Sequence, residues 1–160
     1  MVGRHRWVLD RSATWGVPAH VTVLYPFMPP DRIGDGVITT LLPVVAAVAA
    51  FRCTFSHVRW FDDDAALLAP EPDAPFRALT MAVWDRFPDY PPYGGTYPDP
   101  IPHLTIGHAP TADLAGMRLA AADVERELPV HAWIDRVLLI AGTDAPGSWS
   151  TLTECPLRQV

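Results

Sequence analysis

The sequence predicts an α+β fold of two pseudo-symmetric lobes, each built from antiparallel sheet and helices, around a central cleft. Two His-x-Thr segments, residues 20–22 and 103–105, each lead into apolar, strand-like residues. Around them one order of elements occurs twice: a helix, a His-x-Thr strand, a helix, a long strand, a turn and a further strand. Such a repeat predicts two similar units packed together. We therefore expect one domain over residues 1–160, with repeat halves of roughly 1–72 and 73–160.

The first half is expected to open with a helix and a motif strand. Residues 3–13 have helix-forming character, and Gly16 follows as a stop signal. Residues 20–27 are rich in β-branched and aromatic side chains, which predicts a strand. A helix is expected within residues 35–50, where Pro43 must kink it or lie in its first turn.

A hairpin is predicted to close the first half. Residues 51–61 alternate between apolar and polar side chains, and Phe51, Cys53 and Phe55 share one face. Three consecutive aspartates then form a turn before the apolar residues 65–69.

The second half is expected to begin with a helix capped by Asp73, with Phe76, Leu79, Val83 and Phe87 as its apolar stripe. A loop rich in Pro, Gly and Tyr, residues 88–102, leads to a strand over residues 103–106. Thr111 is expected to cap the next helix, and its stripe is the most regular in the chain: Leu114, Met117, Ala121, Val124 and Leu128. Residues 130–141 and 148–157 predict a closing hairpin.

The composition restricts the class of protein. With 160 residues, 49% hydrophobic, the chain can bury a core, and no apolar run reaches the roughly 18 residues of a membrane span. We therefore expect a soluble, cytoplasmic protein without a membrane partner. Cys53 and Cys155 are too few and too isolated for a disulfide framework or a zinc site, so we expect buried free thiols.

The charge balance bears on possible ligands. The formal net charge is −6, and all 12 basic residues are arginines without a cluster or stripe. Because binding to a long phosphate backbone depends on gathered cations, long duplex nucleic acid is not an expected partner. A few convergent donors in a cleft can still hold one phosphate.

The two His-x-Thr segments predict phosphodiester chemistry. Residues i and i+2 of a strand project to the same face, so His20 with Thr22, and His103 with Thr105, each form an imidazole and hydroxyl pair. Histidine can take a proton from an attacking oxygen or protonate a leaving oxygen near neutral pH. Threonine hydroxyls can donate to the non-bridging oxygens of the transition state. We expect the four side chains to face one cleft as catalytic residues.

One such motif alone carries little information. With six histidines, about 0.7 chance matches to His-x-Ser/Thr are expected. The shared context distinguishes these two, since both follow a proline within two residues and both open equivalent halves of the repeat. The alternative is that they are polar residues of an edge strand with a purely structural role.

On these motifs the chain resembles the two-histidine phosphoesterase superfamily, most closely its 2′-5′ RNA ligase-like branch. The likeness in order of elements covers nearly the whole chain, and sequence likeness is concentrated in residues 18–27, 60–76 and 91–108. The resemblance implies cyclic phosphodiesterase or RNA-end-processing activity without a metal or other cofactor. Relatives usually carry a strand ahead of the first helix. No segment before Gly3 can form it here, so we expect one lobe to have one strand fewer.

Three tyrosines and three further histidines are weaker candidates for site residues. Tyr25, Tyr93 and Tyr97 lie near the motifs and are candidates for stacking on a base, although packing alone would also explain them. His57 and His131 lack a Ser or Thr two residues on and are interpreted as packing or surface residues. His108, five residues after His103, is either a neighbour of the second motif at the site or a residue at the end of its strand. No His-x-x-x-His, His-Glu-x-x-His or Cys-x-x-Cys pattern occurs, so no metal is required.

The leading hypothesis is therefore an enzyme that acts on 2′,3′-cyclic phosphate or 2′-5′ phosphodiester bonds of small nucleotides or RNA ends. A noncatalytic nucleotide- or RNA-end-binding module and a purely structural two-lobed domain are the alternatives. Intact motifs favour the enzyme, because a binding module has no need of two proton-transfer groups. Base preference, reaction direction, the roles of the two histidines and the oligomeric state are left open by the sequence.

Overall fold

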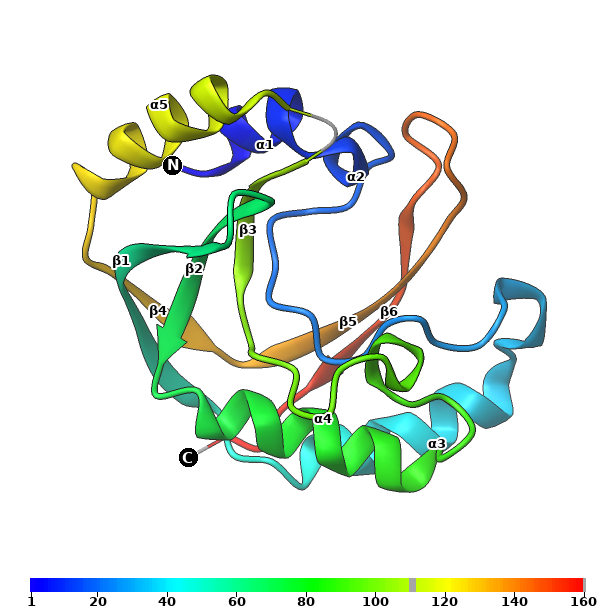
Figure 1. Ribbon diagram of the computed structural model, residues 1–160. Helices are drawn as coiled ribbons and strands as arrows, with labels where there is room; N and C mark the ends of the chain where they lie inside the picture. The colour runs from blue at the N-terminus through cyan, green and yellow to red at the C-terminus, as the bar shows by residue number, and fades with distance from the viewer. Residues whose placement is uncertain (110–111, 160) are drawn as a thin grey trace.

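The computed structural model describes residues 1–109 and 112–159 as an α+β fold (Figure 1). The helices are α1 (Gly3–Leu9), α2 (Arg11–Thr14), α3 (Asp35–Ala46), α4 (Ala74–Arg86) and α5 (Leu114–Glu125), with short 3-10 turns at Pro30–Arg32 and Pro92–Gly95. The strands are β1 (Phe51–Phe61), β2 (Ala65–Glu71), β3 (Leu104–His108), β4 (Val130–Ile134), β5 (Arg136–Ala141) and β6 (Ser150–Pro156). The described part of the chain contains no helix long and apolar enough to cross a membrane.

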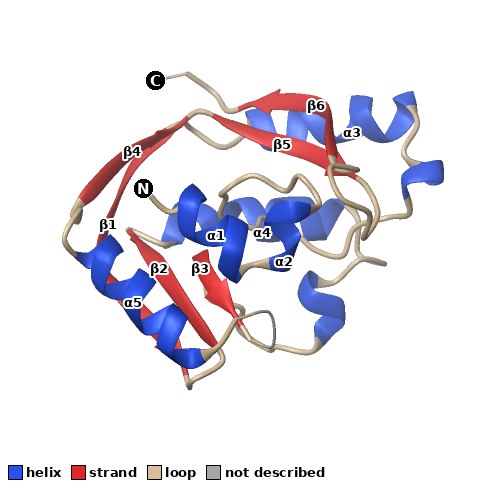
Figure 2. Ribbon diagram, turned by 90° about the horizontal axis from the view of Figure 1, so that it is seen from above, coloured by secondary structure: helices blue, strands red, loops and turns tan. Residues whose placement is uncertain are grey.

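Two antiparallel sheets form the two lobes, which confirms the predicted fold class. The larger sheet has the strand order β3-β2-β1-β4 and curls across the molecule, whereas the smaller sheet pairs β5 with β6 (Figures 1 and 2). Helices α1 and α5 pack on the larger sheet, and α3 packs on β6 and α4. The larger sheet takes β1 and β2 from before residue 72 and β3 and β4 from after it, so its strands come from both halves of the sequence.

Two apolar cores hold the lobes, and α4 belongs to both. Phe76 packs into the core under the larger sheet, while Leu79 and Val83 pack into the core that also contains Leu139 of β5. The apolar stripe predicted for this helix is therefore confirmed, and α4 connects the cores of the two lobes. The two cysteines are buried and free, one in each core, and burial raises the pKa of both thiols.

The predicted strand over residues 130–141 is divided between the two sheets. Ala132 and Ile134 pack on the first core, whereas Val137 and Leu139 pack on the second. The inward side chains change from even to odd positions, which a continuous strand cannot do without turning one set outward. The chain therefore breaks at Asp135, and β4 joins the larger sheet while β5 forms the predicted hairpin with β6.

Residues 20–27 were predicted as a strand, but they do not form a continuous one. Their one strand-like pairing in the described part of the chain is an isolated antiparallel bridge between Val21 and Leu104. The reason is that other groups take the backbone carbonyls that a neighbouring strand would use. The Thr80 hydroxyl donates to the carbonyl of Val23 at 2.7 Å, and the backbone N–H of Tyr93 donates to the carbonyl of Tyr25 at 2.6 Å. The segment is therefore held by α4 and by the loop before β3.

Three helix boundaries differ from expectation. The predicted first helix breaks at Asp10, whose backbone is extended and whose carboxylate caps α2 by accepting from the Ser12 N–H. Asp73 precedes α4 but makes no capping bond, because its carboxylate pairs with Arg77 one turn further on. The cap of α5 is Asp113, and Thr111 lies outside the described residues.

Candidate active site

The bridge between Val21 and Leu104 brings the two motifs together at the junction of the lobes. Extending the antiparallel register by one residue in each direction puts His20 across from Thr105 and Thr22 across from His103. Val21 and Leu104 pack against the core under the larger sheet. Because neighbouring side chains of an extended segment alternate, the four motif side chains turn to the opposite face. The structure thus assembles His20, Thr22, His103 and Thr105 in one place.

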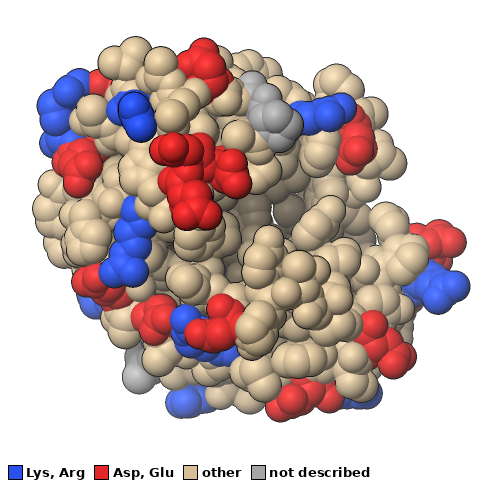
Figure 3. Space-filling view, viewed as in Figure 1, with Lys and Arg blue, Asp and Glu red and all other residues tan. Residues whose placement is uncertain are grey.

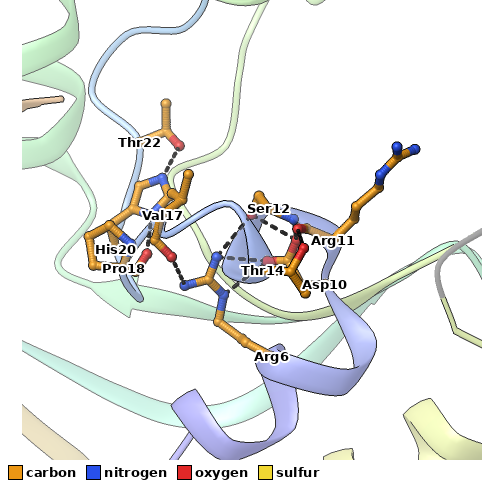
Figure 4. Close-up of polar contacts among 9 residues, drawn as sticks. All are labelled: Arg6, Asp10, Arg11, Ser12, Thr14, Val17, Pro18, His20 and Thr22. Carbon is orange, nitrogen blue, oxygen red and sulfur yellow. Dashed lines mark hydrogen bonds and ion pairs between the residues drawn. The ribbon is translucent and has the colours of Figure 1, made fainter. Parts of the chain in front are cut away.

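The ring of His20 is fixed by two short contacts (Figure 4). Its Nδ1 lies 2.7 Å from the carbonyl oxygen of Pro18, and its Nε2 lies 3.1 Å from the Thr22 hydroxyl oxygen. A carbonyl only accepts, so Nδ1 carries the proton and the Thr22 hydroxyl donates to Nε2. In this tautomer Nε2 is the basic atom of the ring, and it points to the second residue of its own motif.

His103 is oriented in the same way. Its Nδ1 donates to the carbonyl of Ile101 at 2.8 Å, again two residues before the histidine. The ring packs edge-on against Phe61, with the centroids 5.3 Å apart and the planes at 78°. The same rule of tautomers leaves Nε2 of His103 as its proton-accepting atom. Both motifs therefore present Nε2 and hold Nδ1 by the backbone.

The environment of His20 favours the neutral imidazole. Burial is the main cause of its lowered pKa, and the positive charges of Arg6 and His103 act in the same direction, against the Pro18 carbonyl and Asp10. A neutral histidine at pH 7 can act as a proton acceptor. Because this pKa lies below its ordinary value of 6.5, the unfolded chain binds the proton more tightly. The contribution of His20 to folding stability is therefore lost as the pH falls below about 6.5.

The three tyrosines differ in how they meet the site. Tyr93 is half-buried, and burial raises its pKa. Its hydroxyl lies beside the side chain of Thr22. Its backbone has φ of 51°, in the left-handed region that non-glycine residues seldom adopt. Tyr97, 59% exposed, packs edge-on against Tyr93 at 5.7 Å. Tyr25 supplies its backbone carbonyl to Tyr93, while its side chain is 54% exposed.

The remaining candidate histidines lie on other parts of the larger sheet. His57 is exposed and 4.0 Å from Glu71. His131 on β4 contacts the hydroxyl of Thr54 at 3.0 Å. His108 is exposed at the far end of β3 from His103. Within residues 1–109 and 112–159, no three His, Cys, Asp or Glu side chains are grouped so as to hold a metal ion.

Two residues of the site were not predicted from the sequence. Phe61 packs on His103, whereas strict alternation along residues 51–61 would put it on the core face with Phe51, Cys53 and Phe55. The bulge of β1 between Phe55 and Val58 turns Phe61 to the other face, and the sequence carries no signal of that bulge. Arg6 is only 3% exposed, although it carries a charge. Its signal was its place on the helical stripe with Val2 and Leu9, where an apolar residue is expected.

The surface around the motifs is hollowed and carries little charge. Figure 3 shows a recess in the middle of the face where Figure 1 draws β3 and the segment of residues 18–27. No acidic or basic side chain is visible inside the recess, whereas a group of acidic side chains lies over the turn between β1 and β2. That turn is the aspartate run 62–64. The recess therefore shows no charged side chain of its own and lies beside a negative rim.

The comparison with known families gives one result. A model of the 2′-5′ RNA ligase superfamily matches residues 8–145, a range that contains both His-x-Thr motifs. No curated protein matches the chain.

Proposed function

The chain belongs to the 2′-5′ RNA ligase superfamily, within the two-histidine phosphoesterases, and from this we propose that it is a metal-independent phosphodiesterase or RNA-end-processing enzyme. Its substrates would be 2′,3′-cyclic phosphates or 2′-5′ phosphodiester bonds of small nucleotides or RNA ends. The observation that carries the proposal is the Val21 to Leu104 bridge, which brings together two imidazoles that both present Nε2. No cofactor is needed for the two proton transfers.

In this proposal His20 is the general base and His103 the general acid for opening a cyclic phosphate. Neutral His20 takes a proton from water through Nε2 while the water oxygen attacks phosphorus. The bond from phosphorus to the ribose oxygen breaks, and protonated His103 gives its Nε2 proton to that oxygen. The lowered pKa of His20 supports this assignment. In the direction of bond formation the two histidines exchange roles.

The threonines would hold the negative charge of the transition state. The Thr22 hydroxyl, which donates to His20 in the free protein, would turn to donate to a non-bridging phosphate oxygen. Thr105 would do the same from β3. Donors aimed at a developing charge stabilise the transition state more than the ground state, which is the condition for faster turnover. Tyr93, on Thr22, and Tyr97 beside it are then candidates to contact the nucleoside, as is the exposed ring of Tyr25.

We propose a nucleotide or a short RNA end as substrate, and not a long duplex. The net charge is −6, and many arginines are already paired with carboxylates. The paired arginines are Arg4, Arg6, Arg77, Arg118, Arg126 and Arg136. The other six arginines are scattered along the sequence without a cluster or stripe that could follow a phosphate backbone. Affinity is therefore expected to come from one clamped phosphate and a stacked base, the latter on the order of 1–3 kcal/mol.

A substrate panel in EDTA tests the proposed function. We expect turnover of 2′,3′-cyclic mononucleotides or 2′-5′-linked dinucleotides without added metal, because the histidines supply both proton transfers. A 20-mer that carries the same cyclic end should have a kcat/KM similar to that of the mononucleotide, at low and at raised salt. A large advantage of the 20-mer that disappears at raised salt would indicate binding along the phosphate backbone. Loss of activity on chelation, with recovery on adding a divalent ion, would contradict the two-histidine mechanism. Binding without turnover of any member would favour the noncatalytic module.

A further inference from the structure

Each motif has an arginine that donates a hydrogen bond to a backbone carbonyl shortly before the motif histidine. Arg6 of α1 donates through Nη1 to the carbonyl of Val17 at 3.3 Å. Arg77 of α4 donates through Nη1 to the carbonyl of Pro100 at 3.3 Å. Each carbonyl belongs to the third residue before a motif histidine, and each arginine comes from the helical segment that precedes its motif.

Each of these arginines is oriented by an aspartate four residues away. Asp10 accepts from Nε and Nη2 of Arg6 at 2.9 and 2.7 Å, and the same Nη2 also donates to the Ser12 hydroxyl (Figure 4). Asp73 accepts from Nε of Arg77 at 2.7 Å, and Asp99 accepts from its Nη1. A guanidinium held in this way is fixed in position, so its remaining N–H can fix the backbone carbonyl it meets.

The held carbonyl is next in sequence to the one that orients the histidine. Val17 precedes Pro18, whose carbonyl accepts from Nδ1 of His20. Pro100 likewise precedes Ile101, whose carbonyl accepts from Nδ1 of His103. Fixing one peptide limits the rotation of its neighbour, because only two soft dihedrals separate them. Each arginine therefore helps to set the direction of the neighbouring carbonyl, that of Pro18 or Ile101, which keeps the proton of the histidine on Nδ1.

We propose that Arg6 and Arg77 are positioning residues, each for the histidine of its own motif. Each would keep the preceding turn in the conformation in which the histidine carries its proton on Nδ1 and presents Nε2 to the phosphate. The expected loss of activity rests on the proposed function, whereas the expected change in the tautomer of the histidine ring does not. Arg6 is 3% exposed and the Arg77 side chain 33%, so the effect should be larger in the first motif.

A crossover experiment with Arg6→Met and Arg77→Met tests the proposal. The ¹⁵N chemical shifts of the two imidazoles report which nitrogen carries the proton. We expect Arg6→Met to shift the tautomer balance of His20 away from Nδ1–H and to leave His103 unchanged, and Arg77→Met to do the reverse. Arg4→Met on α1 and Arg86→Met on α4 are the matched controls, since these exposed arginines contact Glu127 and Phe87. Both rings should be unchanged in the controls.

The kinetic arm uses the substrate that the panel identifies. Each variant should lower kcat by about 10- to 100-fold with little change in KM, as expected when a reacting group is misplaced by about 1 Å. The proposal would be overturned if one variant changed the tautomer balance of both histidines, or if neither variant changed it. This holds whatever the kinetic result is. If no substrate is turned over, the proposed function fails, and the ¹⁵N measurement still decides the positioning role.

Folding of the Arg6 variant is controlled separately, because Arg6→Met leaves Asp10 buried without its partner, which is strongly destabilising. The double variant Arg6→Met with Asp10→Leu removes both buried charges together with the cap of α2, and thermal melting shows that it is folded before its rings are compared. It also lacks the Val17 contact, so His20 should again lose its Nδ1–H preference. A folded double variant in which His20 keeps that preference would overturn the role of Arg6.

Discussion

His20→Ala and His103→Ala should each lower kcat/KM by about 10²- to 10⁴-fold, the usual contribution of a positioned proton-transfer group. Both rings are held by their Nδ1 contacts so that Nε2 is presented, and alanine removes the whole imidazole. The measurement is steady-state kinetics on a 2′,3′-cyclic mononucleotide in EDTA. The double variant should lose little more than the worse single variant, since groups that act as a unit are not additive.

His57→Ala and His131→Ala are the controls for this prediction. Both histidines lie in the larger sheet at exposed positions away from the Val21 to Leu104 bridge, and neither has a role in the proposed mechanism. Their kinetics should match those of the unchanged protein. Thermal melting of all variants separates loss of chemistry from loss of fold. Folded His20 and His103 variants with unchanged turnover would contradict the assigned chemistry.

Thr22→Ala and Thr105→Ala should each reduce kcat by roughly 10²- to 10³-fold, the effect of losing one donor to a developing negative charge. Serine keeps the hydroxyl, so Thr22→Ser and Thr105→Ser should retain most of the activity. The comparison of kcat with KM matters, because a donor that acts only in the transition state changes kcat and leaves KM nearly constant.

Thr54→Ala is the matched control for the threonine variants. Thr54 lies on β1 and contacts His131 on β4, at the edge of the larger sheet opposite β3. It should have no effect on turnover. An equal loss in the alanine and serine variants would mean that the methyl group matters and the hydroxyl does not, which would contradict the proposed role.

The parts of the fold that could be predicted are those set by local pattern. The alternation of residues 51–61 and the three aspartates after them predicted the hairpin of β1 and β2, and the stripe of Phe76, Leu79 and Val83 predicted α4. In these elements the side chains that face the core repeat at the period of the backbone. Local propensity and burial therefore indicate the same structure.

The parts that could not be predicted depend on contacts distant in sequence. Residues 20–27 have strand propensity, but Thr80 and the Tyr93 backbone take the carbonyls of Val23 and Tyr25. The break at Asp135 arises because the chain passes from one core to the other. The motif residues were found because they repeat, whereas Phe61 and Arg6 reach the site only through tertiary packing.

The central claim is that the two histidines bind one phosphate between them. Titrating the protein with a nucleoside 2′-monophosphate in EDTA, with detection of the imidazole ¹⁵N and ¹H signals, tests this most directly. Before ligand is added, His20 should titrate below its ordinary pKa of 6.5, because its ring is partly shielded from solvent. On binding, the signals of both His20 and His103 should shift along one 1:1 saturation curve. The pKa of His20 should rise, since a phosphate dianion favours the charged imidazole. Two curves with different dissociation constants, or a response from only one ring, would contradict a shared phosphate site.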